Sequence, residues 1–293
     1  MSRTLLTGAT GFIGRHLAPA LRQAGHEVFE ASSQSGDVAE DSTWSRFPQS
    51  ELVVHLAGKT FVPHSWADPS AFVKCNLLGT IAALNYCKKH NARMVYLSSY
   101  LYGNPQALPI PETAPLVTTN PYALSKILAE KACQFYSDSL EIDITILRPF
   151  NVYGPGQPAS FLIPTIIRQV LAGESIQVKD LEPKRDYLFI SDLVDAILKA
   201  VAPKKGARIF NIGSGRSYSV AELIQIIQGI RKTDLEIISS AERRKDEIMD
   251  TVADISRAYR DLGWRPKVGL EDGLRSVLAQ MSSNHPGNAN VKV

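Results

Sequence analysis

The sequence has little cysteine, little net charge and no long apolar run, and each absence excludes a class of protein. Cys75, Cys87 and Cys133 are the three cysteines, and no two of them form a CxxC pair. We therefore expect reduced thiols, with neither a disulfide framework nor a metal site. The formal net charge of +3 is too small and too evenly spread to indicate nucleic-acid binding. No apolar run approaches the roughly 20 residues of a membrane-spanning helix, so we also expect no membrane partner.

The composition is that of a folded chain with a large core. Hydrophobic residues make up 44% of the 293 positions, enough for one large α/β domain or for a domain with a smaller cap. The first predicted strand begins at Arg3, which leaves no room for a signal peptide before it. We expect a cytoplasmic protein.

Apolar strands alternate with amphipathic helices through the first half of the chain. The strands are expected at 4–7, 26–31, 52–57, 93–98 and 142–147, and the helices at 13–24, 71–89 and 121–137. Strict alternation predicts a Rossmann-like, doubly wound parallel sheet with helices on both faces.

The strict alternation of strands and helices ends after Pro149. A Gly/Pro loop is expected at 151–158, followed by helices near 161–172, 191–201 and 219–230 and short strands near 176–178, 187–189 and 208–212. Ser219 and Glu222 have the spacing of a capping box at the start of the last helix. We expect a first domain of residues 1–152 plus about 186–215, a smaller C-terminal α/β cap of 153–185 and 216–281, and a flexible tail of 282–293.

Three glycines separate the first strand from the first helix. Gly8 permits a tight turn, Gly11 lets the backbone approach a ligand, and Gly14 lets the helix pack close to the strand. Free N–H groups at the helix N-terminus would then bind the pyrophosphate of a dinucleotide. A plain structural turn is the alternative. The candidate cofactor-binding residues are Gly8, Thr10, Gly11, Phe12, Ile13, Gly14 and Arg15.

Tyr122 and Lys126 stand four residues apart on a predicted helix, so their side chains share a face. A phenol has a pKa of about 10, and a nearby ammonium and an oxidised nicotinamide would both lower it. Tyr122 could then donate or accept a proton near neutral pH. The alternative is a buried aromatic side chain beside a solvated lysine.

The GxxGxxG spacing and the YxxxK pair resemble the extended short-chain dehydrogenase/reductase family, over roughly residues 3–280. His55-Leu56-Ala57-Gly58 and Arg148-Pro149-Phe150-Asn151-Val152-Tyr153-Gly154-Pro155 also resemble that family. The resemblance implies that Lys126 touches the nicotinamide ribose and that further residues hold the cofactor. These are Asp37 and Val38 at the adenine, Leu56, Ala57 and Gly58 under the cofactor, and Asn76, which steadies it.

The choice of dinucleotide depends on the end of the second strand, where an acidic residue marks NAD. The matching position is Ser32, whose hydroxyl can donate to a 2′-phosphate, and Arg15 could add positive charge. These residues favour NADP(H). Glu30, two positions earlier, keeps NAD(H) possible if the register is shifted.

A third catalytic group is expected at the end of the strand near Val95, to polarise the substrate oxygen. Ser98 and Ser99 both qualify. The number of residues before Tyr102 favours Ser98, whereas the register of the strand favours Ser99. A deletion in the loop would change the first count and leave the strand register unchanged. We therefore choose Ser99. Family members that eliminate water carry an acidic pair after this serine. Tyr100 and Leu101 follow here, which disfavours a dehydratase.

The stretches at 55–76, 148–157 and 184–186 resemble the nucleotide-sugar branch of the family, especially the reductases of GDP-4-keto-6-deoxy-mannose. By that resemblance Asn151 and Arg185 would bind the diphosphate or sugar, and Arg244 and Glu247 the phosphate and the nucleotide ribose. A solvated charge run is the alternative for residues 242–247. Val62 and His64 are candidates to line the sugar pocket, with His64 as a possible second proton donor.

The resemblance implies an NAD(P)H-dependent reductase of a nucleotide-activated 4-keto-6-deoxyhexose linked to GDP, dTDP or UDP. Ser99, Tyr122 and Lys126 would be its catalytic residues. A nucleotide-sugar 4-epimerase with tightly bound NAD is the second hypothesis, and a dinucleotide sensor without chemistry is the third. The resemblance also implies a homodimer joined through the helices at 71–89 and 121–137.

Overall fold

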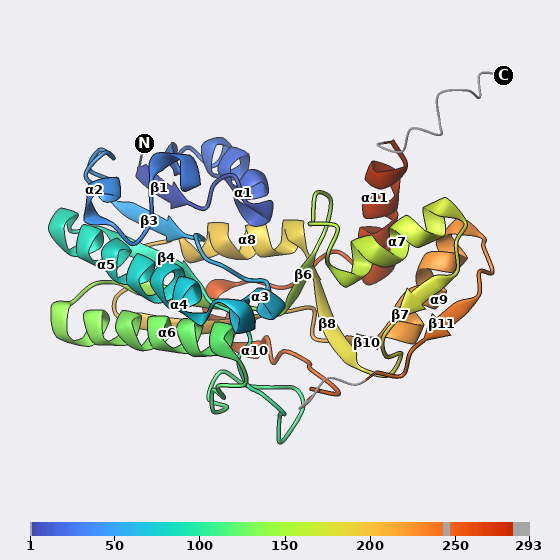
Figure 1. Cartoon of the computed structure of the whole chain (residues 1–293). Coiled ribbons are helices and arrows are strands. Elements are labelled where there is room, and N and C mark those ends of the chain that lie inside the picture. The colour runs from blue at the N-terminus through green and yellow to red at the C-terminus, as the bar shows by residue number, and fades with distance from the viewer. Residues whose placement is uncertain (1, 243–246, 284–293) are drawn as a thin grey trace.

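A six-stranded parallel sheet forms the centre of the first domain. The computed structural model describes residues 2–242 and 247–283 (Figure 1). The strand order is β2-β1-β3-β4-β5-β9, and all five neighbouring pairs are parallel. The strands are β1 (Arg3–Thr7), β2 (Glu27–Ala31), β3 (Leu52–His55), β4 (Arg93–Leu97), β5 (Ile144–Pro149) and β9 (Ala207–Ile212). The doubly wound sheet predicted from the alternation is confirmed.

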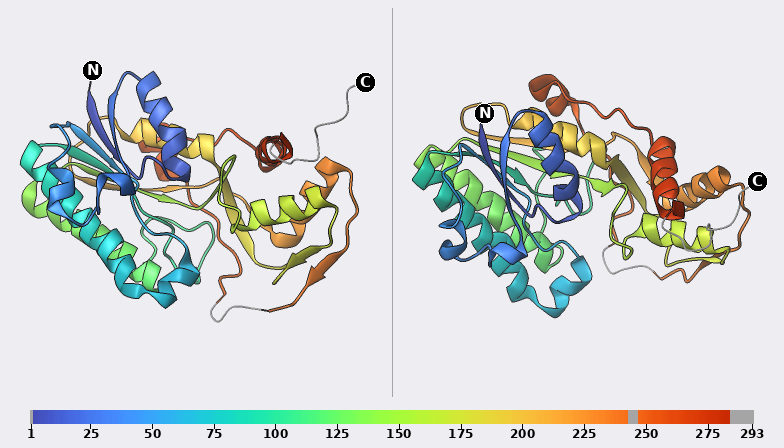
Figure 2. Two further views of the ribbon diagram at one scale, coloured as in Figure 1. Left: turned by 45° about the horizontal axis from the view of Figure 1, so that its top comes forward. Right: turned by 90° about the horizontal axis from the view of Figure 1, so that it is seen from above.

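Helices cover both faces of this sheet. Figures 1 and 2 show α1 beside α8 on one face and α5 beside α6 on the other. Leu5 and Leu6 of β1 belong to different core clusters, because successive side chains of a strand point to opposite faces. The helices are α1 (Phe12–Gln23), α8 (Ile190–Ala200) and α10 (Ser256–Leu262) on the first face, and α2 (Asp41–Trp44), α5 (Gly79–His90) and α6 (Pro121–Leu140) on the second.

A smaller α/β unit with its own core lies to the right in Figure 1, and we refer to the larger and smaller units as the first and second domains. Its helices are α7 (Leu162–Ala172), α9 (Val220–Arg231) and α11 (Leu270–Ser283). One small sheet has the order β10-β8-β6, and a second pairs β11 with β7. These strands are β6 (Asn151–Tyr153), β7 (Ile176–Val178), β8 (Lys184–Phe189), β10 (Ser217–Ser219) and β11 (Ile237–Ser239). The predicted capping box is present at Ser219 and Glu222.

Two segments differ from their predicted form. Asn151–Tyr153 was expected as loop but forms β6, which pairs in parallel with residues 187–189. The helix expected over 71–89 is built from α4 (Pro69–Phe72), a π-helical turn (Val73–Leu78) and α5. The polar segment before it also forms helix, at α3 (Val62–Ala67), and Ser33–Ser35 forms a 3-10 turn.

The division into two domains stays a proposal, with two amendments. Within 216–281, α10 packs against β9 and α8, and Ala258 and Trp264 belong to the core of the first domain. Helix α11 continues to Ser283, so it includes the first residues of the expected tail, and the rest of that tail lies outside the described residues. Across the described ranges, no helix combines the length and apolarity needed to cross a lipid bilayer.

Candidate active site

Hydrogen bonds of one side chain join the carboxyl ends of β1 and β3 at the edge of the sheet. The Oγ1 of Thr7 accepts a hydrogen bond from the N–H of Ala57 at 3.1 Å and lies 2.8 Å from Nδ1 of His55. Burial lowers the pKa of His55 to about 3, so its ring is neutral. This contact fixes the start of the segment that includes Leu56, Ala57 and Gly58, which were predicted to lie under a cofactor.

The glycine turn has the geometry that its spacing predicts. Gly8 has φ of +68°, in the left-handed region. A Cβ on Gly14 would lie 2.3 Å from the carbonyl oxygen of Gly8, so only glycine lets α1 approach the strand this closely. Gly11 is the N-cap of α1 and offers no side-chain oxygen to the first-turn amides, while Thr10 and Gly11 are exposed. Phe12 and Ile13 begin the helix, and its N-terminus fits a pyrophosphate.

A hollow of about 500 Å³ adjoins this turn. Arg22 and Glu30 form an ion pair of 2.5 Å in its wall, and Arg15 donates from Nε to the carbonyl oxygen of Thr10 at 2.8 Å. The hydroxyl of Ser32 caps the 3-10 turn by accepting from the N–H of Gln34. This cap uses the Ser32 oxygen as an acceptor and does not use its O–H, and the hollow presents two guanidinium groups as well. Its lining residues are Ala9, Thr10, Arg15, Ala18, Pro19, Arg22 and Glu30.

Asp37, Val38 and Asn76, which were expected to hold the cofactor, form contacts within the protein. Asp37 pairs with Lys74 at 2.8 Å, and this hydrogen bond lowers the pKa of Asp37. Val38 accepts at its carbonyl from the Trp44 indole at 2.8 Å. Asn76, on the π-helical turn, is buried and donates to Ser125 Oγ at 2.9 Å.

Asn76 also holds the segment beside Gly58. Its Oδ1 accepts from the N–H of Lys59 at 2.7 Å, and its Nδ2 donates to the carbonyl oxygen of Lys59 at 3.0 Å. A Cβ on Gly58 would lie 3.0 Å from that Oδ1. Asn76 thus locks the segment after β3 against α6, and its predicted contact with the cofactor stays a prediction.

Tyr122, Lys126 and Ser99 come together at the carboxyl end of β4. Helix α6 starts where Asn120 accepts from the N–H of Ala123 at 2.9 Å, with Pro121 as its first residue. This start places Tyr122 in the first turn, where Ser99 is near enough to lower the pKa of its phenol. The Nζ of Lys126 is buried and donates to the carbonyl oxygen of Leu97 at 2.7 Å.

Burial shifts the pKa of both members of this pair. It raises the pKa of Tyr122 to about 12, and the Ser99 side chain offsets only part of that rise. Burial also lowers the pKa of Lys126 to about 8, while the charge of Glu130 acts in the opposite direction. The expected fall in the phenol pKa depended also on an oxidised nicotinamide, and in the protein alone desolvation sets the direction of the shift. Tyr122 is a proton donor in this state.

The two candidate serines have different surroundings. Ser98 is buried, and its Oγ has no hydrogen-bond partner among the described residues. Ser99 is half-buried and reaches Tyr122. The choice of Ser99 therefore stays our assignment, with a contact to support it.

The predicted substrate residues fall into two groups. Asn151 accepts at Oδ1 from the hydroxyl of Tyr100 at 3.0 Å, and Tyr100 stacks on Phe150. Arg185 pairs with Glu247 and donates to the carbonyl oxygen of Ile248 at 2.6 Å, so both predicted nucleotide-binding groups are engaged with each other.

Three predicted substrate residues remain, and the structure describes two of them. Arg244 lies outside the described residues. Val62 begins α3, and the exposed ring of His64 contacts Phe61, which in turn contacts Phe161 of the second domain.

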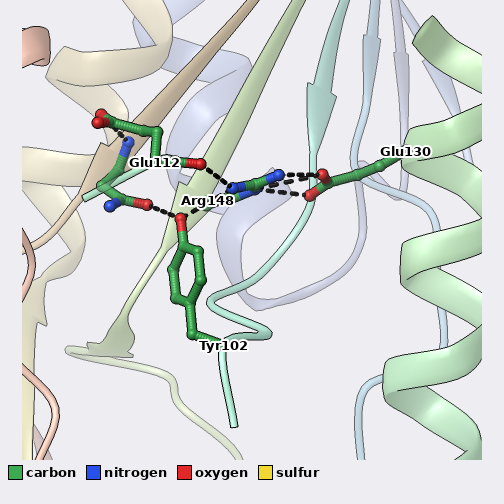
Figure 3. A network of polar contacts seen from close by, with 5 residues as sticks. Tyr102, Glu112, Glu130 and Arg148 are labelled. Atoms are coloured by element: carbon green, nitrogen blue, oxygen red, sulfur yellow. Dashed lines mark hydrogen bonds and ion pairs between the residues drawn. The ribbon is translucent and has the colours of Figure 1, made fainter. Parts of the chain in front are cut away.

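One buried network next to this site was not predicted. Arg148 of β5 pairs with Glu130 of α6 at 2.6 Å, and each side chain is 5% exposed (Figure 3). Glu130 follows Lys126 by four residues and Tyr122 by eight, so the sequence did contain a signal on α6. Its partner could not be inferred, because Arg148 comes from a separate strand.

Comparisons with known proteins agree with this geometry. The profile of the NAD dependent epimerase/dehydratase family matches residues 4–213. GDP-6-deoxy-D-mannose reductase of Pseudomonas aeruginosa is 31% identical, covering 96% of this chain and 97% of that protein. UDP-glucose 4-epimerase of Mycolicibacterium smegmatis is also 31% identical, covering 94% of this chain and 97% of that protein.

Solved structures of similar fold support the same family. The structure of RMD from Pseudomonas aeruginosa complexed with NADPH has a TM-score of 0.89 at 31% identity, covering 97% of this chain and 100% of that one. UDP-glucose 4-epimerase of Thermotoga maritima with UDP-glucose has a TM-score of 0.91 at 27% identity, covering 96% of this chain and 99% of that one. Overall similarity therefore identifies a family and does not choose between a reductase and an epimerase.

Proposed function

Since the chain belongs to the NAD dependent epimerase/dehydratase family, the extended branch of the short-chain dehydrogenases/reductases, we propose that it is an NADPH-dependent reductase of a nucleotide-activated 4-keto-6-deoxyhexose. The observation that carries the proposal is the protonated phenol of Tyr122, which lies with Ser99 and the buried Lys126 at the carboxyl end of β4. A carbonyl reduction needs an acid at this point, and a phenol with a pKa of about 12 is one.

Separate groups of residues bind the coenzyme and act on the sugar. The glycine turn and the N-terminus of α1 hold the pyrophosphate, and Asn76 keeps the neighbouring segment in place. The nicotinamide, when bound, supplies the hydride for the carbonyl carbon of the sugar. Ser99 donates to the carbonyl oxygen, and Tyr122 transfers its proton to the same atom. The ammonium of Lys126 stabilises the phenolate that Tyr122 becomes.

NADPH is the proposed coenzyme because the carboxylate near the end of β2, that of Glu30, is already paired with an arginine. Glu30 lies within β2, and its carboxylate is held by Arg22. Arg15 and Arg22 line the adjoining hollow and suit a 2′-phosphate. The relative whose structure contains NADPH supports the same choice.

A homodimer is proposed through α5 and α6. Leu124 and Phe135 lie about three helical turns apart on one face of α6 and are 39% and 60% exposed. Leu78, at the start of α5, is 45% exposed. An apolar face of this kind fits a second copy of the chain, and light scattering after gel filtration tests the mass.

A 4-epimerase is the second candidate, and one observation favours it: the epimerase of Thermotoga maritima has a TM-score of 0.91. The test is to incubate the protein with NADPH and with GDP-, dTDP- and UDP-linked 4-keto-6-deoxy sugars. We expect coenzyme oxidation in proportion to product. Interconversion of UDP-glucose and UDP-galactose without net coenzyme change would make the chain an epimerase instead.

A further inference from the structure

A buried ion pair continues the catalytic face of α6. Glu130 lies one turn beyond Lys126, as Lys126 lies one turn beyond Tyr122. Arg148 donates from Nε to both carboxylate oxygens of Glu130 at 3.0 and 3.2 Å, and from Nη2 at 2.6 Å. Figure 3 shows the guanidinium and the carboxylate facing each other between β5 and α6.

Further contacts hold the arginine in this orientation. Its Nη1 donates to the hydroxyl of Tyr102 at 2.9 Å and to the carbonyl oxygen of Glu112 at 3.1 Å. The Tyr102 hydroxyl donates in turn to Oδ1 of Asn211 at 2.5 Å. The guanidinium cannot leave Glu130 without breaking this network.

Burying two charges is costly, and apolar side chains could join α6 to β5 if the contact were only structural. Taking a charged group out of water costs several kcal/mol per ion, and well-packed apolar residues often replace buried pairs without loss. An ion pair at this position therefore suggests a function for the charge itself.

The nearest function is the protonation of Lys126. The ionisable groups whose charge would act on its ammonium are Glu130 and Cys133 on α6 and Cys75 on the π-helical turn. The ammonium in turn lowers the pKa of His55 on β3, and Nζ lies 4.4 Å from the centre of the Tyr96 ring on β4. Burial raises the pKa of both cysteine thiols and of Tyr96, so these groups are neutral near pH 7. Glu130 is the negative charge in this set.

We infer that Glu130 is a positioning residue for Lys126: its carboxylate keeps the buried ammonium charged, while Arg148 occupies both carboxylate oxygens and leaves the ammonium directed at Leu97. Lysine and glutamate four residues apart on a helix otherwise pair directly. Such a pair would draw Nζ away from the end of β4 and from Tyr122. The arginine prevents it.

The catalytic part of this inference rests on the proposed function, but the titration of Lys126 does not. The measurement is the pH titration of lysine side chains labelled with ¹³C at Cε, followed by NMR on the full chain. The Lys126 signal is identified by its absence in Lys126→Arg. We compare Glu130→Gln, Arg148→Met and the double variant, with Asp192→Asn as a control. Asp192 is an equally buried carboxylate on α8 that holds the N–H groups of Lys267 and Val268.

Opposite shifts are expected from the two single variants. Glu130→Gln lowers the Lys126 pKa by about one unit, because the attracting charge is lost. Arg148→Met raises it, because Glu130 then pairs with Lys126, and the displaced ammonium reduces kcat by about 10²-fold. The double variant regains thermal stability but keeps the low Lys126 pKa. Asp192→Asn lowers stability without moving the titration.

Two outcomes would overturn the inference. One is a Lys126 titration unchanged in Glu130→Gln or, if that variant does not fold, unchanged in the double variant. The other is an upward shift in Arg148→Met without loss of kcat. If no coenzyme oxidation is found with any sugar, the proposed function fails while the titration still decides the role of Glu130.

Discussion

The Nζ of Lys126 donates to the carbonyl oxygen of Leu97 at 2.7 Å, two residues before Ser99 in the chain. This bond ties the middle of α6 to the end of β4. It brings an ammonium, a phenol and a hydroxyl to one place at the rim of a parallel sheet, where ligands of doubly wound folds bind. The predictions below follow from that convergence.

The two neighbouring serines should respond differently to substitution. Ser99→Ala removes the hydroxyl that contacts Tyr122, and we expect kcat/KM to fall by about 10²-fold with the fold intact. Ser98→Ala removes a buried hydroxyl without a described partner and should leave kcat/KM within about twofold. Steady-state kinetics of the two variants test this. The reverse order of effects would assign the role to Ser98.

The glycines of the turn should separate packing from coenzyme binding. Gly14→Ala places a methyl group 2.3 Å from a carbonyl oxygen, so we expect a loss of stability of about 1–3 kcal/mol. Gly11 has φ of −72° and its nearest Cβ contact is 3.2 Å away, so Gly11→Ala should fold normally. Its methyl group would still obstruct the pyrophosphate and weaken NADPH binding. Urea unfolding and NADPH fluorescence titration measure the two effects. Unchanged NADPH affinity in Gly11→Ala would argue against a dinucleotide at this turn.

Arg22 should select the 2′-phosphate. Loss of a charge-assisted contact in Arg22→Gln is expected to weaken NADPH binding about tenfold and to leave NADH binding unchanged. Glu30→Gln releases Arg22 from its partner and should strengthen NADPH binding. Arg3→Gln is the matched control, because Arg3 forms a comparable exposed ion pair with Glu27 away from the hollow. Equal affinity of the unmodified protein for both coenzymes would refute the preference.

Acid should destabilise the protein partly through His55. The pKa of this buried ring is about 3 in the folded protein, against an ordinary value of 6.5 for a histidine exposed to water. Between those values the unfolded chain binds a proton that the folded one does not, so stability falls as pH falls, by about 1.4 kcal/mol per unit. Urea unfolding between pH 6.5 and 5 should show a shallower slope for His55→Gln than for the unmodified protein. The exposed His64→Gln is the control and should keep the steeper slope. Identical slopes for all three would contradict the neutral state of His55.

The fold of the first domain could be predicted because its signals are local. Each strand is a short apolar run, and each helix after it has a periodic apolar face. In the second domain the short strand β7 and the end of β8 were predicted, but β6, β10 and β11 were not. Residues 151–153 form β6 only because residues 187–189 lie beside them, and no local pattern announces a partner that distant in sequence.

The same difference between local patterns and contacts distant in sequence applies to the site. The spacing of Tyr122 and Lys126 marks one helix face, and the glycine spacing marks the turn, so both were visible in the sequence. The ion pairs Arg148–Glu130 and Arg185–Glu247 each join separate elements, and the hydrogen bonds of Thr7 join β1 to the segment after β3. The pKa of Tyr122 depends on burial by neighbours from several elements, which no local pattern in the sequence reports.

The measurement that tests the central proposal most directly is transfer of deuterium from NADPH labelled at nicotinamide C4 to a GDP-linked 4-keto-6-deoxy sugar. We expect the label at C4 of the product, in an amount equal to the coenzyme consumed. Tyr122→Phe should bind NADPH with unchanged affinity and transfer label at least about 10²-fold more slowly. A product without deuterium at C4, or transfer that is equally fast without the phenol, would contradict the assignment of Tyr122 as proton donor in a carbonyl reduction.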